Sequence, residues 1–215
     1  GITGEYKVEV LQGETVLATT TFTDQDGNQS CSGNYTLEGQ VKNDGYTTGN
    51  LCQGSGDCWA EGENVPARLT ITGLTSGISY LAGVQHDYQL GGTITGYDNF
   101  DIPSSGNASA TGISFSPPMV VSCGGSTTCK NYTLSFTASS DTVQLDWFAQ
   151  LGDNAAQWSG GSLHYRLTQG VCGENIGNKD VPINPQNIVV IGSITVYKYI
   201  MGTATLLPGA TFALC

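Results

Sequence analysis

The cysteine spacing is the feature of this chain most directly tied to chemistry. Cys52 and Cys58 enclose the loop CQGSGDC, and Cys123 and Cys129 enclose the loop CGGSTTC, with five residues inside each pair. Zinc-binding cysteines are usually separated by about two to four residues and are often joined by histidine, which neither loop has nearby. The spacing therefore predicts two short-range disulfides, Cys52–Cys58 and Cys123–Cys129, and no metal site.

The number of cysteines indicates the compartment. Seven cysteines occur in the chain, which in a secreted protein means three bridges and one further thiol. Spacing alone leaves the pairing of three of them open: Cys31, Cys172 and Cys215. Gly1 in place of Met is what signal-peptide removal would leave, so we expect an extracellular, cell-surface protein.

Candidates for catalysis are few. His86 and His164 are the two histidines, and neither lies in a GxSxG, HExxH or Cys-His setting. Because a general base needs a partnered nucleophile, pairing within a sheet is the favoured interpretation of both. The stretch 24–28 (DQDGN) resembles half of a calcium loop, but Tyr35 stands where a bidentate glutamate would be needed, which favours a hairpin turn. We predict no enzyme activity and no cofactor.

Several residues are candidates for ligand binding or modification. Trp59 lies beside a predicted disulfide loop and could stack on a sugar, whereas Trp147 falls in an apolar alternation that is typical of a core residue. Asp98 and Asp101 could bind calcium or carbohydrate hydroxyls. Four N-x-[ST] sequons are candidate glycosylation sites: Asn28, Asn34, Asn107 and Asn131.

Composition excludes two classes of partner. The formal net charge is −11, and only 12% of the residues are charged. A chain of this charge repels phosphate backbones and anionic lipid headgroups, so nucleic-acid binding is not expected. No apolar run approaches the roughly 20 residues needed to cross a bilayer, so we expect no membrane insertion.

Strand periodicity dominates the chain. Apolar residues alternate with polar ones in many segments, which predicts an all-β fold: disulfide-stapled β-sandwiches of immunoglobulin-like or jelly-roll-like type. Residues 5–23 are expected to form a hairpin, and 153–158 at most a helical turn. The alternation predicts one buried face from Val143, Leu145 and Trp147, with a second on a neighbouring strand from Leu163, Tyr165 and Leu167.

Tandem prolines suggest how the chain is divided. Pro117 and Pro118 cannot continue a strand ladder, so we place a boundary there. The expected regions are 1–117, 118–192, which could form one sandwich with the first, and 193–215.

Two stretches carry a resemblance. Residues 69–100 (LTITGLTSGISYLAGVQHDYQLGGTITGYDNF) and 143–169 (VQLDWFAQLGDNAAQWSGGSLHYRLTQ) resemble a β module of secreted bacterial and archaeal surface proteins. In that family a "tGLtpG" turn is followed by a "W…GSPyHmRL" signature and a "GtItIiK" exit strand. The resemblance implies a surface protein of β architecture.

The C-terminal segment is similar to a different family. Residues 192–215 (GSITVYKYIMGTATLLPGATFALC) resemble the first two strands of a Cna-B or SpaA-type surface repeat. Such repeats often carry a Lys–Asn isopeptide bond, and the resemblance implies Lys198 as the lysine.

These features predict a structural or adhesive extracellular protein. Terminal strands without partners are used for strand exchange between subunits, so we expect a head-to-tail homopolymer in a surface fibre or pilus-like filament. Alternatives are a monomeric carbohydrate-binding adhesin and a secreted glycoside hydrolase.

Overall fold

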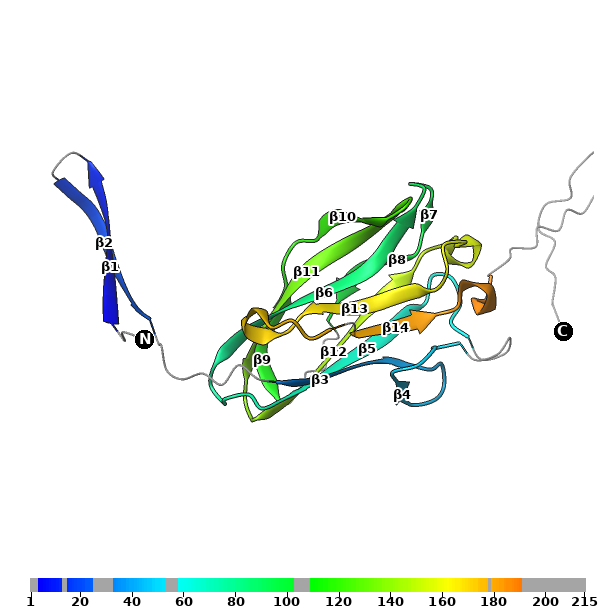
Figure 1. Ribbon diagram of the computed structural model, residues 1–215, viewed down its shortest axis with the longest axis horizontal. Helices are drawn as coiled ribbons and strands as arrows, with labels where there is room; N and C mark the ends of the chain where they lie inside the picture. The colour runs from blue at the N-terminus through cyan, green and yellow to red at the C-terminus, as the bar shows by residue number, and fades with distance from the viewer. Residues whose placement is uncertain are drawn as a thin grey trace, which may run out of the picture.

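Antiparallel strands form nearly all of the regular structure (Figure 1). The computed structural model describes residues 4–12, 15–24, 33–52, 58–102, 109–177 and 179–190. The three short 3₁₀ turns lie at Ala155–Gln157, Val171–Gly173 and Pro185–Asn187. The first of these turns is the one expected within 153–158.

The N-terminal strands form a sheet of their own. β1 (Gly4–Gln12) and β2 (Thr15–Asp24) pair antiparallel from Gly4 opposite Asp24 to Gln12 opposite Thr15. This confirms the hairpin predicted over 5–23. Figure 1 shows it in dark blue, and its two strands pair with no other described strand.

The larger of the other two sheets has seven strands. Its main path is β10-β11-β6-β13-β14, while β7 pairs with β6 and β9 pairs with β11. The strand bounds are β6 Ser79–Leu90, β7 Ile94–Thr95, β9 Ala110–Phe115, β10 Met119–Gly124, β11 Thr127–Ala138, β13 Leu163–Gln169 and β14 Lys179–Ile183. β9 and β10 both pair with β11, along different parts of its length, and β10 is the outermost strand at that end of the path.

The smaller sheet has five strands in the order β4-β3-β5-β12-β8. Their bounds are β3 Asn34–Gln40, β4 Tyr46–Thr47, β5 Asn64–Thr72, β8 Tyr97–Asp101 and β12 Thr142–Leu151. The chain turns back between β3 and β4 at Asp44-Gly45, a dipeptide type that is common in hairpin turns, and Val41 N–H donates to the Gly45 carbonyl.

The two sheets pack face to face around one apolar core. Tyr97 of the small sheet stacks on Tyr165 of the large sheet with ring centroids 4.4 Å apart, and Tyr165 Oη donates to the Val65 carbonyl across the core. The six predicted core residues are all buried: Val143, Leu145, Trp147, Leu163, Tyr165 and Leu167. The predicted phase of both strands is confirmed, but β12 and β13 are not neighbours: they lie in different sheets.

The tandem prolines do not divide the sandwich. β5 and β6 precede them in sequence, yet β5 pairs with β12 and β6 pairs with both β11 and β13. The alternative expectation is that 118–192 could form one sandwich with the preceding region, and the strand pairing agrees with it. The prolines instead separate β9 from β10. The region 193–215 lies outside the described residues.

Candidate functional site

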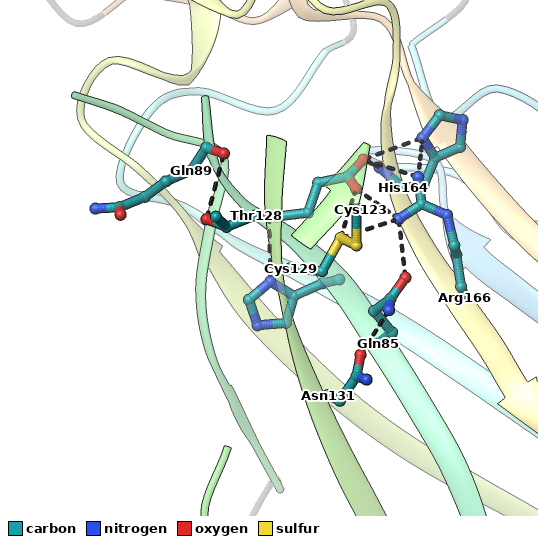
Figure 2. Close-up of a disulfide and its surroundings, with 10 residues drawn as sticks. Gln85, Gln89, Cys123, Thr128, Cys129, Asn131, His164 and Arg166 are labelled. Carbon is teal, nitrogen blue, oxygen red and sulfur yellow. Dashed lines mark hydrogen bonds and ion pairs between the residues drawn. A yellow bond between two sulfur atoms is a disulfide. The ribbon is translucent and has the colours of Figure 1, made fainter. Parts of the chain in front are cut away.

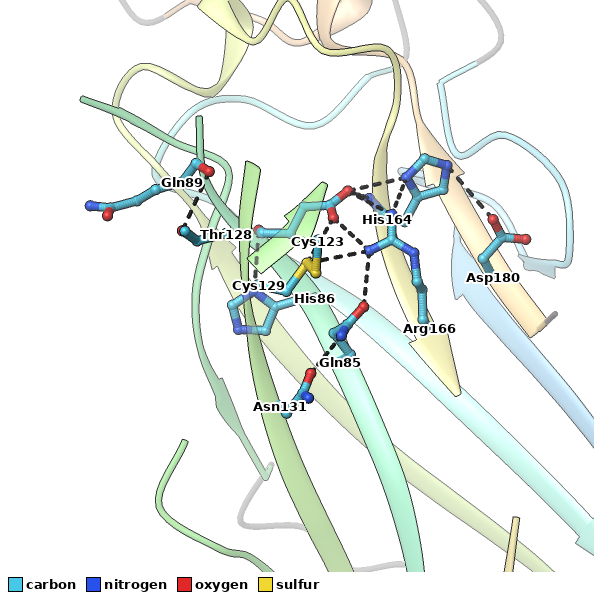
Figure 3. Close-up of polar contacts among 11 residues, drawn as sticks. Gln85, His86, Gln89, Cys123, Thr128, Cys129, Asn131, His164, Arg166 and Asp180 are labelled. Atoms are coloured by element: carbon cyan, nitrogen blue, oxygen red, sulfur yellow. Dashed lines mark hydrogen bonds and ion pairs between the residues drawn. A yellow bond between two sulfur atoms is a disulfide. The ribbon is translucent and has the colours of Figure 1, made fainter. Parts of the chain in front are cut away.

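A row of polar side chains crosses the outer face of the large sheet (Figures 2 and 3). Residues that pair directly across antiparallel strands share a face. Arg166 of β13 is opposite Gln85 of β6 and Asp180 of β14, and Cys129 of β11 is opposite Asp87 of β6. The strand order therefore brings together side chains from four strands that are far apart in the sequence.

Asp87 is the centre of this row. Its side chain is only 3% exposed. Arg166 donates to both carboxylate oxygens, from Nη1 to Oδ1 at 2.5 Å and from Nη2 to Oδ2 at 3.1 Å, and the His164 backbone N–H donates to Oδ2 at 2.9 Å. Burial acts to raise the pKa of Asp87, but hydrogen bonds from His164 and Arg166 and the guanidinium charge outweigh burial and lower it. Asp87 is therefore a buried carboxylate that stays ionised.

The guanidinium of Arg166 is paired within the protein. Besides its bonds to Asp87, Nη1 donates to Gln85 Oε1 at 3.3 Å and Nη2 lies 2.9 Å from His164 Nδ1. Three terminal N–H groups thus have acceptors on Asp87 and Gln85, and the fourth faces His164 Nδ1. The side chain links these two strands, and because its charge is already paired it is not available to an anionic ligand.

His164 lies between two carboxylates (Figure 3). Its Nδ1 is 3.1 Å from Asp87 Oδ2, and its Nε2 is 3.7 Å from Asp180 Oδ2. A serine-type triad would need a hydroxyl or thiol at Nε2, and no described serine or cysteine makes a hydrogen bond to that nitrogen. The contacts match the cross-strand pairing expected from the sequence.

The Cys123–Cys129 disulfide lies against this cluster (Figure 2). Cys129 is fully buried, with Sγ 3.4 Å from Asp87 Oδ1 and 3.9 Å from Arg166 Nη1, whereas Cys123 is exposed. The bridge joins β10 to β11 and covers one side of the carboxylate. The sulfur atoms thus help to keep water from Asp87.

A hollow of about 360 Å³ opens beside the cluster, bordered by the disulfide, Trp158 and Gly160. The Trp158 side chain is 4% exposed, and its indole Nε1 has no hydrogen-bond partner among the described residues. A Cβ atom on Gly160 would lie 3.3 Å from that nitrogen, which is closer than Cβ atoms usually approach, so glycine fits this position. Thr127 and Ser162 also line the hollow. The hollow is polar and close to electrically balanced.

His86 lies behind Asp87, on the inner face of the sheet. Its Nδ1 is 3.2 Å from the Asp87 carbonyl and its Nε2 is 3.3 Å from Tyr132 Oη, and the ring packs against Phe100. Burial, followed by the positive charge of Lys130, lowers the pKa of His86 to about 3 against the weaker effects that raise it. The imidazole is therefore neutral at physiological pH and belongs to the core.

Trp59 does not present a free stacking platform. Its ring is partly buried against the core, Nε1 donates to the Gln40 carbonyl at 3.0 Å, and Lys42 Nζ lies 5.9 Å from the ring centroid. These contacts fix the indole in the fold.

The two aspartates of β8 have separate partners. Asp98 is 3.4 Å from Lys130 Nζ, which also donates to Asn99 Oδ1 and lies 3.7 Å from the centroid of the Tyr88 ring. Asp101 Oδ1 accepts from the Ile102 backbone N–H. The two carboxylates thus make separate contacts, and in the described part of the chain no group of three His, Cys, Asp or Glu side chains is placed to hold a metal ion.

The predicted glycosylation sites differ in how exposed they are. Asn34 is exposed at the start of β3, whereas Asn131 is half-buried and its Oδ1 accepts from Gln85 Nε2 at 2.5 Å. Of the predicted sites, these lie outside the described residues: Cys31, Cys215, Lys198, Asn28 and Asn107.

The disulfide predictions are confirmed. Cys52–Cys58 and Cys123–Cys129 are bonded, with Cα atoms 4.8 and 5.9 Å apart. Cys172 is also disulfide-bonded, to a cysteine outside the described residues.

Sequence reasoning missed Asp87 and Arg166 as a pair. A signal was present: if Leu163, Tyr165 and Leu167 face the core, His164 and Arg166 must face outward on the same strand. Asp87 continues the outward-facing polar positions of β6, but it is buried, beside a register shift between Thr128 and Cys129 in the facing strand. Nothing in the sequence, however, makes β6 the neighbour of β13.

Comparison with known proteins returns no family model and no curated protein that matches this chain. Among the described residues, no helix is long and apolar enough to cross a membrane.

Proposed function

We propose that this chain is a structural subunit of an extracellular fibre, joined to its neighbours by pairing of terminal strands. The observation that carries the proposal is the two-stranded sheet β1–β2, which pairs with no other described strand. A two-stranded hairpin alone is at best marginally stable in water, so it gains from a third strand. A neighbouring subunit can supply one.

The disulfides support the proposed location of the fibre outside the cell. Three described disulfide sites, Cys52–Cys58, Cys123–Cys129 and Cys172, are typical of an oxidising compartment outside the cytoplasm. A contact that repeats head to tail without closing produces a filament. By resemblance, 193–215 is a second segment that could be exchanged, and Lys198 a lysine that could form an isopeptide link.

Truncation tests the proposal. The full-length chain should sediment as large species and show fibres by negative-stain microscopy, whereas a chain lacking residues 1–24 should be monomeric. Because β1 and β2 pair with no sandwich strand, the shortened chain should keep the melting temperature of the sandwich. A third chain lacking 193–215 measures what that segment adds. If all three chains are stable monomers, the proposal is wrong.

A second function, saccharide binding, is favoured by the hollow beside Trp158. The hollow is lined by the hydroxyls of Thr127 and Ser162 and by Trp158, which suit a neutral sugar, whose hydroxyl groups both donate and accept. The charge of Arg166 is already paired with Asp87, so an acidic sugar is not the expected ligand.

Nuclear magnetic resonance can test this second function directly, because the chain has three tryptophans and hence three indole N–H signals. Titration with glucose, galactose, mannose and N-acetylglucosamine should shift the Trp158 signal. Trp147 is the matched control, since its Nε1 is also buried without a partner but does not line the hollow. An unmoved Trp158 signal with every sugar contradicts saccharide binding.

A further inference from the structure

The strand edges of the sandwich differ in how well they are protected against pairing. Natural sheets block unwanted strand addition with charged residues, prolines, bulges, very short edge strands or covering loops. Within the described ranges, the outermost strands are β10 and β14 in the large sheet and β4 and β8 in the small sheet, with β9 beside β10 on β11 and the two-residue β7 on β6.

The edge strand β14 is protected by composition and by a loop. Its sequence, KDVPI, contains two charged residues and a proline. The Pro182 carbonyl also accepts a hydrogen bond from the Leu51 backbone N–H at 3.0 Å. A further strand would have to displace that loop.

The edges of the small sheet are protected as well. β4 is two residues long, and β3 next to it carries Glu38. β8 carries Asp98 and Asp101, both exposed. Bringing another strand against these carboxylates would cost desolvation and repulsion, most of all for a strand from a chain with net charge −11.

β9 is interrupted rather than charged. Its pairing with β11 shifts register between Ser135 and Thr137, and Gly112 has a positive φ of 62°. These irregularities shorten the regular ladder that a new strand could extend.

β10 has none of the charge protection, and its register shift against β11 and the positive φ of Gly124 (107°) fall only at its end, after Ser122. Its sequence, MVVSCG, has no charged residue, and Met119 and Val120 are 63% and 56% exposed. Met119 pairs opposite Asn131 and Val120 opposite Lys130, so the two apolar side chains lie on opposite faces of the strand. A strand placed along this edge would therefore gain apolar contacts on both faces as well as backbone hydrogen bonds.

We propose that the outer edge of β10 is the acceptor for the β1–β2 hairpin of a second copy of this chain. The inference rests on the proposed fibre function and names the surface that receives the donated strands. The hairpin strands, of nine and ten residues, are long enough to cover the six residues of β10. Pairing gives the hairpin its third strand and gives β10 its second neighbour, so each element supplies what the other lacks.

An edge-blocking variant tests the acceptor. Met119→Lys together with Val120→Lys places two charges on β10 without touching the core. Leu81→Lys is the matched control, because Leu81 is 59% exposed but lies on β6, between β11 and β13. The wild type and Leu81→Lys should assemble alike, and the double variant should sediment as a folded monomer.

Mixing two defective chains gives the sharper result. A chain lacking 1–24 has an acceptor but no donor, and the β10 double variant has a donor but no acceptor. Each alone should be monomeric, and an equimolar mixture should form heterodimers that grow no further, with new hydrogen-exchange protection over 119–124.

The outcomes separate the two proposals. A monomeric wild type overturns the fibre function itself. Assembly of the wild type and of the double variant leaves the fibre function in place and overturns β10 as acceptor. Loss of assembly in Leu81→Lys as well, or a mixture without heterodimers, also overturns the assignment of this edge.

Discussion

The buried carboxylate of Asp87 links two neighbouring strands of the large sheet. It joins β6 to β13 through Arg166 and through the His164 backbone, under the cover of a disulfide. A charge in this position is tolerated only because the pairing and the hydrogen bonds are complete. Its loss should therefore cost more than the loss of an exposed pair.

Substitution of Asp87 by Ala should lower the free energy of unfolding by about 3–5 kcal/mol, because it leaves the Arg166 charge without its partner. Lys42→Gln is the control: this lysine pairs with Glu63 at 2.7 Å but is 26% exposed, so about 1 kcal/mol or less is expected. Denaturant unfolding measures both. Equal costs would mean that Asp87 contributes no more than a surface pair.

His86 should make the stability of the fold depend on pH. Its pKa is about 3 in the folded protein and about 6.5 when unfolded, so between these values the unfolded chain binds the additional proton. The contribution of the neutral His86 ring to the free energy of unfolding is complete above about pH 6.5. It declines as the pH falls toward 3, by at most about 1.4 kcal/mol per pH unit.

Unfolding free energies of the wild type and of His86→Phe, compared between about pH 4 and about pH 6.5, measure this effect. The other charged groups near the ring are Lys130, Asp87 and Asp98, and they are the same in both proteins. The wild-type slope should be steeper. Parallel curves would show that His86 does not titrate in the manner expected of a buried neutral ring.

At the scale of elements, apolar and polar residues alternate along the strands, and this places one face of each strand in the core. Leu145 of β12 is 1% exposed, whereas Leu81 of β6 is 59% exposed. Leu145→Ala should cost about 2–5 kcal/mol, since it creates a cavity in the shared core. Leu81→Ala should change stability by about 0.5 kcal/mol or less, and chemical denaturation of both variants checks the comparison. Similar losses would contradict the assigned strand faces.

The loop after β13 should be tied to the segment before β3. Gly33 N–H donates to Glu174 Oε2 at 3.4 Å, and these residues lie two positions after Cys31 and Cys172 respectively. We therefore expect a Cys31–Cys172 disulfide. Peptide mapping without reduction should recover the two cysteines in one linked species; Cys172 linked to Cys215 would contradict this prediction.

At the scale of the whole molecule, net charge opposes assembly. Copies with a charge of −11 repel one another at low ionic strength. The screening length falls from about 30 Å at 0.01 M salt to about 8 Å at 0.15 M, so association should strengthen over that range. Sedimentation at a fixed protein concentration measures it. Weaker association with added salt would mean that contacts between opposite charges hold the copies together.

Local features of the sequence determined much of this molecule. The alternation of Val143, Leu145 and Trp147 predicts which face is buried, because neighbouring residues of a strand point to opposite sides regardless of what the strand pairs with. The bridges Cys52–Cys58 and Cys123–Cys129 follow from short loop closure, which needs no tertiary information. The all-β sandwich follows from many such strands without amphipathic helices.

Strand order was decided only by the tertiary structure. Asp87 and Arg166 are 79 residues apart and meet because β6 lies beside β13, and the same order places β5 and β12 in one sheet across the tandem prolines. The Trp59 indole is likewise held by the Gln40 carbonyl of another segment. Period-two patterns record which face of a strand is apolar, but they do not record which strand is its neighbour. The polar cluster and the open edge of β10 both depend on that choice of neighbours.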